Sequence, residues 1–287
     1  MKPPKFEYHN PATVDEALTL LGEHGDDGKV LAGGQSLVPL LNFRLAYPEH
    51  LIDVNDVEGL DYLRADNGSL RIGAMCRQST LEHSDEVAKG WPLLTEAMTY
   101  VAHPQIRNRG TVGGSVAHAD PAAELPVAFS VLDTKFHVQS TRGKRTLTAD
   151  ELFVTHLTTA MESDELLVEI EVDAPPAGSA SAFVEFSRRH GDFALGGAAV
   201  LLKIDGGKCE SAAIGLLSAA STPVRTSGAE AALVGQAIDE ALATAAGDAA
   251  SAEIDPTGDI HGSADYRKHL IGVMVKRAVL SAAERAG

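Results

Sequence analysis

Hydrophobic and polar positions in the first half of the chain form short segments of both helical and strand character. Thr13-Val14-Asp15-Glu16 has the capping-box pattern, in which a hydroxyl and a carboxylate accept hydrogen bonds from the free N–H groups of a helix start. Apolar residues at helical spacing follow as far as Gly25, which predicts a helix. The capping pattern recurs at residues 79–82, where another helix is expected to begin, and an amphipathic helix is expected over 91–102. Short apolar runs predict strands at 6–8, 30–31, 51–54, 70–74, 135–140 and 166–172.

The pattern changes at residues 174–179, Ala-Pro-Pro-Ala-Gly-Ser, where proline and glycine interrupt regular structure. We therefore expect two domains, residues 1–176 and 177–287. Within the first, subdomains are expected over about residues 1–56 and 57–176.

The second domain is predicted to be a strand meander followed by helices. The Gly-Gly pair in Asp205-Gly206-Gly207-Lys208 is typical of a hairpin turn. The order of strands and helices indicates an α+β fold rather than alternating βαβ units. No G-x-G-x-x-G follows a strand and opens a helix, so a Rossmann fold has no support. The expected elements are strands at 183–188, 198–204 and 212–217, and helices at 228–246 and 265–285.

Composition excludes several classes of function. The formal net charge of −16 argues against a nucleic-acid partner, because phosphate binding needs a basic surface. With only Cys76 and Cys209, the chain cannot build a disulfide framework or a metal or iron–sulfur centre from several of its own thiolates, and we predict no metal ligands. The N-terminus lacks an apolar signal region and no stretch approaches a membrane span, so the chain is expected in the cytoplasm.

Residues 31–37, Leu-Ala-Gly-Gly-Gln-Ser-Leu, are the first candidate binding site. Adjacent glycines after a strand allow positive φ angles and bring consecutive N–H groups towards an anion. Gln35 and Ser36 add side-chain donors, and a pyrophosphate needs this chemistry. Taken alone, the motif is explained equally well by a Gly-Gly turn without a ligand.

A second glycine pair lies in residues 111–115, Thr-Val-Gly-Gly-Ser, which we expect to be a loop. Ala117 follows, and then Asp120-Pro121 is expected to form a turn, while the Glu124 carboxylate is able to accept hydrogen bonds from ligand hydroxyls. The simpler interpretation is a loop with an Asx-type cap before a helix from Pro121 onward. Two such segments in one domain favour a ligand with both phosphates and hydroxyls.

Three motifs together resemble the FAD-binding medium subunit of the carbon monoxide dehydrogenase/xanthine dehydrogenase family, the molybdenum hydroxylases. They are residues 32–37, residues 107–115 with 120–126, and residues 183–194, Phe-Val-Glu-Phe-Ser-Arg-Arg-His-Gly-Asp-Phe-Ala. They occur in the family's order over essentially the whole chain. Their combination is specific, whereas each motif alone is weak.

The resemblance implies a fold of the vanillyl-alcohol-oxidase (PCMH) type, with FAD between two α+β subdomains and a smaller C-terminal domain. It implies that residues 31–37 wrap the pyrophosphate, that Leu166 packs by the adenine half, and that Phe193 lies over the isoalloxazine ring. Ala102, Thr111, Gly114 and Ser115 would line the flavin and its ribityl chain. The expected cofactor-binding residues are Leu31, Ala32, Gly33, Gly34, Gln35, Ser36, Leu37, Ala102, Thr111, Gly114, Ser115, Ala117, Asp120, Glu124, Leu166 and Phe193.

Two positions depart from the family pattern. Glu124 stands where the family usually has aspartate, so the carboxylate reaches one methylene further. The stretch matched by Val184-Glu185 lacks a lysine that many relatives carry. A cation near the flavin N1–C2=O edge stabilises the anionic reduced flavin, so its absence is expected to lower the reduction potential. Whether Arg188 or Arg189 compensates stays open.

The resemblance further implies electron transfer, with no catalytic residue in this chain. Substrate would be oxidised at the molybdenum cofactor of a large subunit, and electrons would pass through iron–sulfur clusters of a small subunit to this FAD and on to an external acceptor. The assembly would be a dimer of heterotrimers. Two alternatives stay open: a stand-alone FAD-dependent reductase or oxidase of the same superfamily, and a scaffold subunit without flavin.

Overall fold

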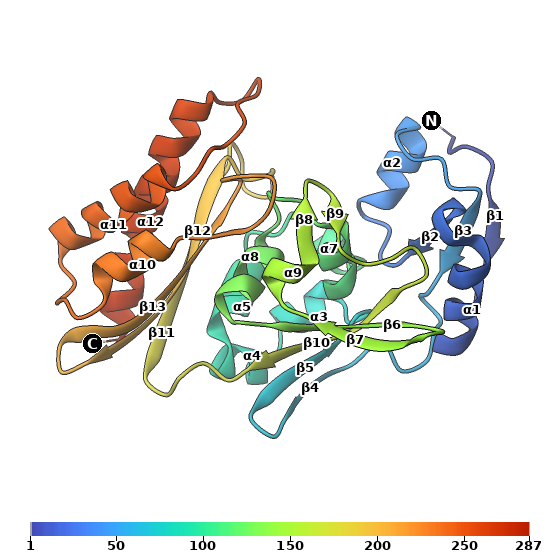
Figure 1. The fold of residues 1–287 in the computed structure, drawn as a ribbon, viewed down its shortest axis with the longest axis horizontal. Helices are drawn as coiled ribbons and strands as arrows, with labels where there is room; N and C mark the ends of the chain where they lie inside the picture. The colour runs from blue at the N-terminus through green and yellow to red at the C-terminus, as the bar shows by residue number, and fades with distance from the viewer. Residues whose placement is uncertain (1, 287) are drawn as a thin grey trace.

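The computed structural model describes residues 2–286, and its N-terminal region, blue in Figure 1, is a parallel sheet of three strands in the order β1-β3-β2. Apolar residues of one helix, Leu18 and Leu21, pack on this sheet and are buried. The elements are β1 (Glu7–His9), α1 (Val14–His24), the 3-10 turn η1 (Gly25–Asp27), β2 (Gly28–Leu31), α2 (Leu37–Phe43) and β3 (His50–Asp53).

The predicted helix start at Thr13 is confirmed. Its hydroxyl accepts a hydrogen bond from the Glu16 N–H at 3.2 Å. The Glu16 carboxylate accepts from the Ala12 N–H at 2.8 Å, one residue before the position of a standard capping box. Both side chains therefore stabilise the start of α1.

The middle region is an antiparallel sheet of five strands in the order β4-β5-β10-β6-β7, with helices packed against it (Figure 1). The last strand in sequence, β10, lies at the centre and pairs with both β5 and β6. β8 and β9 form a separate two-stranded pair. The elements are β4 (Leu63–Asp66), β5 (Ser69–Gly73), α3 (Gln78–Glu82), α4 (Asp85–Gly90), α5 (Pro92–Met98), α6 (Pro104–Arg107), α7 (Val112–His118), α8 (Glu124–Val131), β6 (Lys135–Ser140), β7 (Gly143–Leu147), α9 (Ala149–Leu152), β8 (Phe153–Thr155), β9 (Thr158–Thr159) and β10 (Leu166–Asp173).

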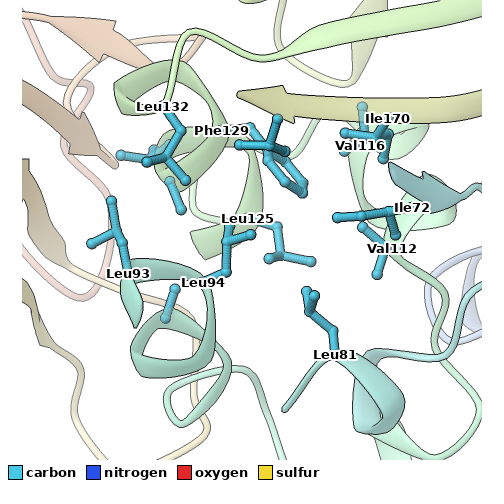
Figure 2. Packing of buried hydrophobic residues seen from close by; sticks show 14 of the residues in the cluster. Ile72, Leu81, Leu93, Leu94, Val112, Val116, Leu125, Phe129, Leu132 and Ile170 are labelled. Atoms are coloured by element: carbon cyan, nitrogen blue, oxygen red, sulfur yellow. The ribbon is translucent and has the colours of Figure 1, made fainter. Parts of the chain in front are cut away.

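The largest core cluster lies between this sheet and helices α5, α7 and α8. Figure 2 shows Leu125 and Phe129 of α8 among side chains from α5, α7 and the sheet, including Leu94, Val116 and Ile72. Residues 125–131 are all buried, as expected of a helix that is apolar on every side. α8 is therefore a central helix of the core.

The C-terminal region is an antiparallel sheet in the order β11-β12-β13-β14, with α10, α11 and α12 lying along one of its faces (Figure 1). The three predicted meander strands are present, and a two-residue strand adds a fourth. Gly206 and Gly207 have φ angles of +55° and +77°, as a tight hairpin turn requires. The elements are β11 (Ser179–Phe186), β12 (Gly196–Asp205), β13 (Lys208–Leu217), β14 (Val224–Arg225), α10 (Ser227–Leu233), α11 (Glu240–Ala252) and α12 (Ala264–Ala286).

The C-terminal sheet and the middle region share part of their core. Phe183 and Leu217 belong to the cluster around α8. The Glu96 carboxylate of α5 accepts from the Phe183 N–H at 3.1 Å and pairs with both terminal nitrogens of Arg285 at 2.7 and 2.8 Å. These contacts hold the two regions together.

Two helix predictions in the middle region were wrong in detail. A helix is present at 79–82, as predicted, but the capping box is not: α3 begins after Arg77, no side chain caps it, and the Glu82 carboxylate binds Arg107 instead. The helix expected over 91–102 is α5, which ends at Met98. The chain then turns through Ala102, which has a φ of +41° that no helix continues.

The single helix expected over 228–246 is two helices. Gly235, with a φ of +81°, lies in the break between α10 and α11. Its N–H donates to the Cys209 carbonyl at 2.8 Å, and the Cys209 N–H donates to Gln236 at 2.8 Å. The break therefore pairs with the start of β13, a long-range contact that helical periodicity does not reveal.

Candidate functional site

The first glycine motif connects β2 to α2 through a tight turn at residues 32–36. Gly34 has a φ of +72°, a conformation that favours glycine. The first backbone hydrogen bond of α2 runs from the Val38 N–H to the Gly34 carbonyl at 3.0 Å. Within residues 2–286, the backbone N–H groups of 32–37 donate to no protein acceptor. Consecutive free donors in such a turn form an anion-binding concavity.

The side chains of this turn differ in their roles. The Gln35 amide donates to the Gly33 carbonyl at 3.0 Å and so fixes the turn. Ser36 is exposed and its hydroxyl does not cap α2. The Ser36 hydroxyl is therefore wholly available to a ligand, whereas one N–H of the Gln35 amide is used within the turn.

The second glycine motif forms the first turn of α7, so the prediction of a loop was wrong. Thr111 is the N-cap, and its hydroxyl accepts from the Gly114 N–H at 3.1 Å. The Gly113 N–H donates to the Ala74 carbonyl at 2.9 Å. A Cβ on Gly113 would lie 2.6 Å from that same carbonyl oxygen, so glycine allows α7 to lie directly against the chain that follows β5. These N–H groups bind the protein itself.

The two glycine motifs lie against each other. A Cβ on Gly33 would overlap the Arg109 carbonyl oxygen and lie 2.7 Å from the Gly110 Cα. A Cβ on Gly114 would lie 3.4 Å from the Ala32 Cβ. The structure thus brings two segments about 80 residues apart in the sequence side by side, which the prediction of a shared ligand requires.

Asn55 and Arg77, which the sequence analysis did not identify, join the two motifs. The Asn55 amide donates to the Ala32 carbonyl at 2.8 Å. The Arg77 guanidinium donates to the Asn55 side-chain oxygen at 2.8 Å and to the Arg109 carbonyl at 2.6 Å. Their sequence signal was weak, since each is a polar residue a short distance after a strand.

Arg107, the first residue of the motif at 107–115, holds the turn at Ala102. Its guanidinium donates to the Val101 and Ala102 carbonyls at 2.7 and 3.3 Å, and it forms a two-pronged pair with Glu82 at 2.7 and 2.8 Å. A Cβ on Gly191 would lie 2.7 Å from the Ala102 carbonyl oxygen. The loop before β12 therefore rests on this turn, and it brings the C-terminal region to the site.

Two carboxyl groups, on α8 and on β11, lie near enough to the turn at Ala102 and to each other to interact electrostatically. Burial raises the pKa of Glu124, at the start of α8, to about 7. Burial and the neighbouring Glu124 carboxylate raise the pKa of Glu185, on β11, to about 9. The Glu185 Oε2 is buried and has no hydrogen-bond partner in the described part of the chain. Nearby, Asp120 accepts from the Ala122 N–H at 2.9 Å, which forms the predicted Asx turn, although α8 begins at Glu124 rather than Pro121.

The remaining predicted residues lie on α7, in the loop before β12 and at the start of β10. Ser115 is half-buried and Ala117 is exposed on α7. Phe193 is 76% exposed, in the loop that rests on Ala102. Leu166 is buried in the core cluster that α1 and β3 share with the middle region, so it packs between the N-terminal sheet and the middle region.

The chain matches two family models in succession. The FAD binding domain in molybdopterin dehydrogenase matches residues 4–175, and the CO dehydrogenase flavoprotein C-terminal domain matches residues 181–282. The chain belongs to this family of molybdenum hydroxylase flavin subunits. Within residues 2–286, none of its helices combines the length and apolar character needed to span a membrane.

Two named relatives match over nearly their whole lengths. The chain is 47% identical to 6-hydroxypseudooxynicotine dehydrogenase complex subunit alpha of Paenarthrobacter nicotinovorans, covering 100% of this chain and 97% of that one. It is 40% identical to the carbon monoxide dehydrogenase medium chain of Hydrogenophaga pseudoflava, covering 98% of each. A solved structure of the latter organism's enzyme, which lacks the Mo-pyranopterin moiety of the molybdenum cofactor, matches with a TM-score of 0.96 at 43% identity, covering 100% and 99%.

These findings confirm the predicted family, the α+β fold of an FAD-binding domain with a C-terminal domain, the oxidoreductase class and FAD as the cofactor. The site itself agrees with this cofactor. The free N–H groups of residues 32–37 are the donors that a pyrophosphate needs, and they lie beside the second motif rather than at an isolated turn.

Proposed function

We propose that this chain is the FAD-carrying electron-transfer subunit of a molybdenum-containing hydroxylase. In this proposal it takes electrons from iron–sulfur clusters of a small partner subunit and passes them to an external acceptor, while a large partner subunit oxidises the substrate. The row of free N–H groups at residues 32–37 carries the proposal, because a scaffold subunit without flavin has no use for it. Full-length similarity to named subunits supports a partnered rather than a stand-alone enzyme.

The chain's own residues would bind and orient the cofactor, whose flavin ring supplies the capacity to accept and release electrons. Residues 32–37 would donate to the pyrophosphate. Gly114 and Ser115 would line the ribityl chain, Glu124 would hydrogen-bond its hydroxyls, and Phe193 would lie over the ring. The proposed lining is completed by Leu31, Ala102, Thr111, Ala117, Asp120 and Leu166.

The proposed assembly is a cytoplasmic dimer of heterotrimers, in which domains 1–176 and 177–287 of this chain meet at the flavin. Cys76 and Cys209 are free and buried, in agreement with a reducing compartment. The raised pKa of Glu124 keeps part of this carboxyl protonated near neutral pH, so it is able both to donate to and to accept from cofactor hydroxyls.

A matched pair of glycine variants tests the cofactor site. Gly33→Ala places a methyl group against the Arg109 carbonyl and displaces the turn, so bound FAD should fall to less than about a tenth of the wild-type content, as expected when a preorganised anion site is distorted. Gly22→Ala, in α1, meets nothing within 4 Å and should retain full FAD. The measurement is flavin per chain, identified by mass after release. Full FAD in Gly33→Ala would contradict the site.

The electron-transfer role is tested on the assembly purified from its native cells. We expect molybdenum, iron and FAD to co-purify with this chain, and the flavin absorbance to bleach on adding the complex's substrate. After removal of the FAD, substrate oxidation at the large subunit should persist with an artificial acceptor that bypasses the flavin. A chain recovered alone, or flavin that stays oxidised while substrate is consumed, would contradict the proposal.

A further inference from the structure

Three histidines meet at the β1 edge of the N-terminal sheet. His9 ends β1, His24 ends α1 and His50 begins β3. In the parallel pairing, Glu7 lies opposite His50 and His9 lies opposite Ile52, so these side chains share one face. α1 covers that face with its buried leucines and brings His24 over it. Three separate elements therefore each supply one imidazole to the same point.

The imidazoles are close enough to share one ion. A ring nitrogen from each histidine lies within 4.8 Å of those of the other two. The His9 Nε2 and His50 Nδ1 are 3.0 Å apart, and the ring centroids of His24 and His50 are 3.6 Å apart. A hydrogen bond between two imidazoles requires one nitrogen to accept, so at least one of these rings carries an unprotonated nitrogen. Such a nitrogen is a metal ligand.

The surroundings favour a cation. The Glu7 Oε2 lies 3.7 Å from the His50 Nδ1, and in the described part of the chain no lysine or arginine forms an ion pair with Glu7. The other cluster of similar geometry, His137 with Glu169 and Glu171, differs in this respect. Its carboxylates are already paired with Arg71 at 2.6 and 3.0 Å. The positive charge that those carboxylates attract is therefore already supplied by the protein, whereas Glu7 has no such partner in the described part of the chain.

We propose that His9, His24 and His50 form a binding site for one Zn²⁺ ion, with the Glu7 carboxylate or water as fourth ligand. Three imidazoles and an oxygen suit the tetrahedral preference of Zn²⁺ and its nitrogen distance of about 2.0–2.1 Å. The stacked rings of His24 and His50 have to turn apart for their lone pairs to converge. His24 makes no ring hydrogen bond within residues 2–286 and precedes Gly25 at the helix end, which leaves its side chain able to turn.

The ion would cross-link β1, α1 and β3. β3 is the central strand of this sheet and pairs with β2, which leads into the glycine turn at residues 32–36. The role is structural: Zn²⁺ has no redox chemistry, and the cluster lies on the α1 side of the sheet, in elements other than those that carry the glycine motifs. It does not depend on the proposed electron-transfer function.

The test is calorimetric titration of Zn²⁺ into the FAD-loaded full chain, purified without a histidine tag and stripped of metal by a chelator. We expect one Zn²⁺ per chain and a rise in the thermal midpoint. His24→Ala should weaken binding by on the order of 100-fold, the upper end of what loss of a supporting group costs a metal site. Mg²⁺, which prefers oxygen ligands, should not bind.

Two further variants serve as a control and as a second ligand deletion. His83→Ala removes a histidine that is 74% exposed and lies outside the cluster, and it should bind Zn²⁺ like the wild type. His9→Gln provides a second ligand deletion if His24→Ala does not fold, with FAD content reporting on folding in every case. Absence of stoichiometric Zn²⁺ binding, or equal binding in the ligand variants and in His83→Ala, would overturn the proposal.

Discussion

The two glycine pairs, Gly33-Gly34 and Gly113-Gly114, are alike in sequence but differ in what their backbone does. At the first pair the N–H groups of 32–37 are free, and a positive φ at Gly34 turns them in succession. At the second pair the N–H groups bind the Thr111 hydroxyl and the Ala74 carbonyl, and the absence of side chains allows close packing. One pair leaves its donors free, and the other packs closely against the protein.

The difference shows that a Gly-Gly pair allows several backbone conformations and close contacts but does not specify which of them the structure uses. The same lack of a Cβ allows either an exposed turn or a buried helix contact. The neighbours determine which one occurs: a hydroxyl three residues before Gly114 caps a helix, whereas no such cap forms at Ser36. Four sets of variants would break or sharpen this comparison.

The largest effect is expected at the packing pair. Gly113→Val places a branched side chain against the Ala74 backbone, and overpacking of this kind should lower the free energy of unfolding by about 3 kcal/mol. Urea denaturation of the apo chain measures it, with Gly22→Ala as the control, which should gain about 0.5–1 kcal/mol as a helical alanine. If Gly113→Val kept its stability but lost FAD, close packing would not be the role of this glycine and the contrast would fail.

The next effect tests the link between the motifs. Arg77→Ala leaves the Asn55 side-chain oxygen and the Arg109 carbonyl without their donor, which should destabilise the chain by about 2 kcal/mol. The dissociation constant for FAD, from flavin fluorescence, should rise about 10-fold, since 1.4 kcal/mol corresponds to that factor. Arg64→Ala, which removes only a guanidinium stacked on the Tyr62 ring, should leave FAD affinity unchanged. Equal losses of FAD affinity in the two variants would argue that the Arg77 hydrogen bonds do not hold the two motifs together.

The acid pair gives a pH-dependent effect. The folded chain raises the pKa of Glu185 from 4.5 to about 9, so between these pH values the unfolded chain loses a proton that the folded chain keeps. Stability from this group is therefore present below pH 4.5 and falls as the pH rises towards 9, by about 2 kcal/mol after allowance for partial exposure. Glu185→Gln should flatten this fall in urea titrations of the apo chain, and Glu23→Gln, at an exposed position, should not. A fall that persists in Glu185→Gln would place its origin elsewhere.

The smallest effect compares two helix caps. Thr111→Ala and Thr13→Ala each remove an N-cap hydroxyl, and each should lower the free energy of unfolding by about 1 kcal/mol. Only Thr111→Ala should also weaken FAD binding, because α7 begins beside Ala32. Parallel thermal melts and flavin titrations separate the two. Weakened FAD binding in Thr13→Ala would show that helix stability alone explains the loss.

Local patterns predicted much of the fold. Hydrophobic runs located β6 and β10 closely, and Thr13 marked the start of α1, because these elements depend on neighbouring residues. The predictions failed where a distant partner intervened. At 79–82 the Glu82 carboxylate pairs with Arg107 rather than capping a helix, and pairing with Cys209 divides the helix expected over 228–246.

The sequence by itself determined the family, the cofactor class and the two glycine segments, because these rest on residue types in a fixed order. The tertiary structure alone decided which segment keeps its N–H groups free, and that Asn55 and Arg77 tie the segments together. It also decided that Glu124 and Glu185 share one end of the site and that three histidines meet at one sheet edge. Residues far apart in the chain meet only after strands pair and helices pack, and spacing along a sequence does not encode which of them will meet.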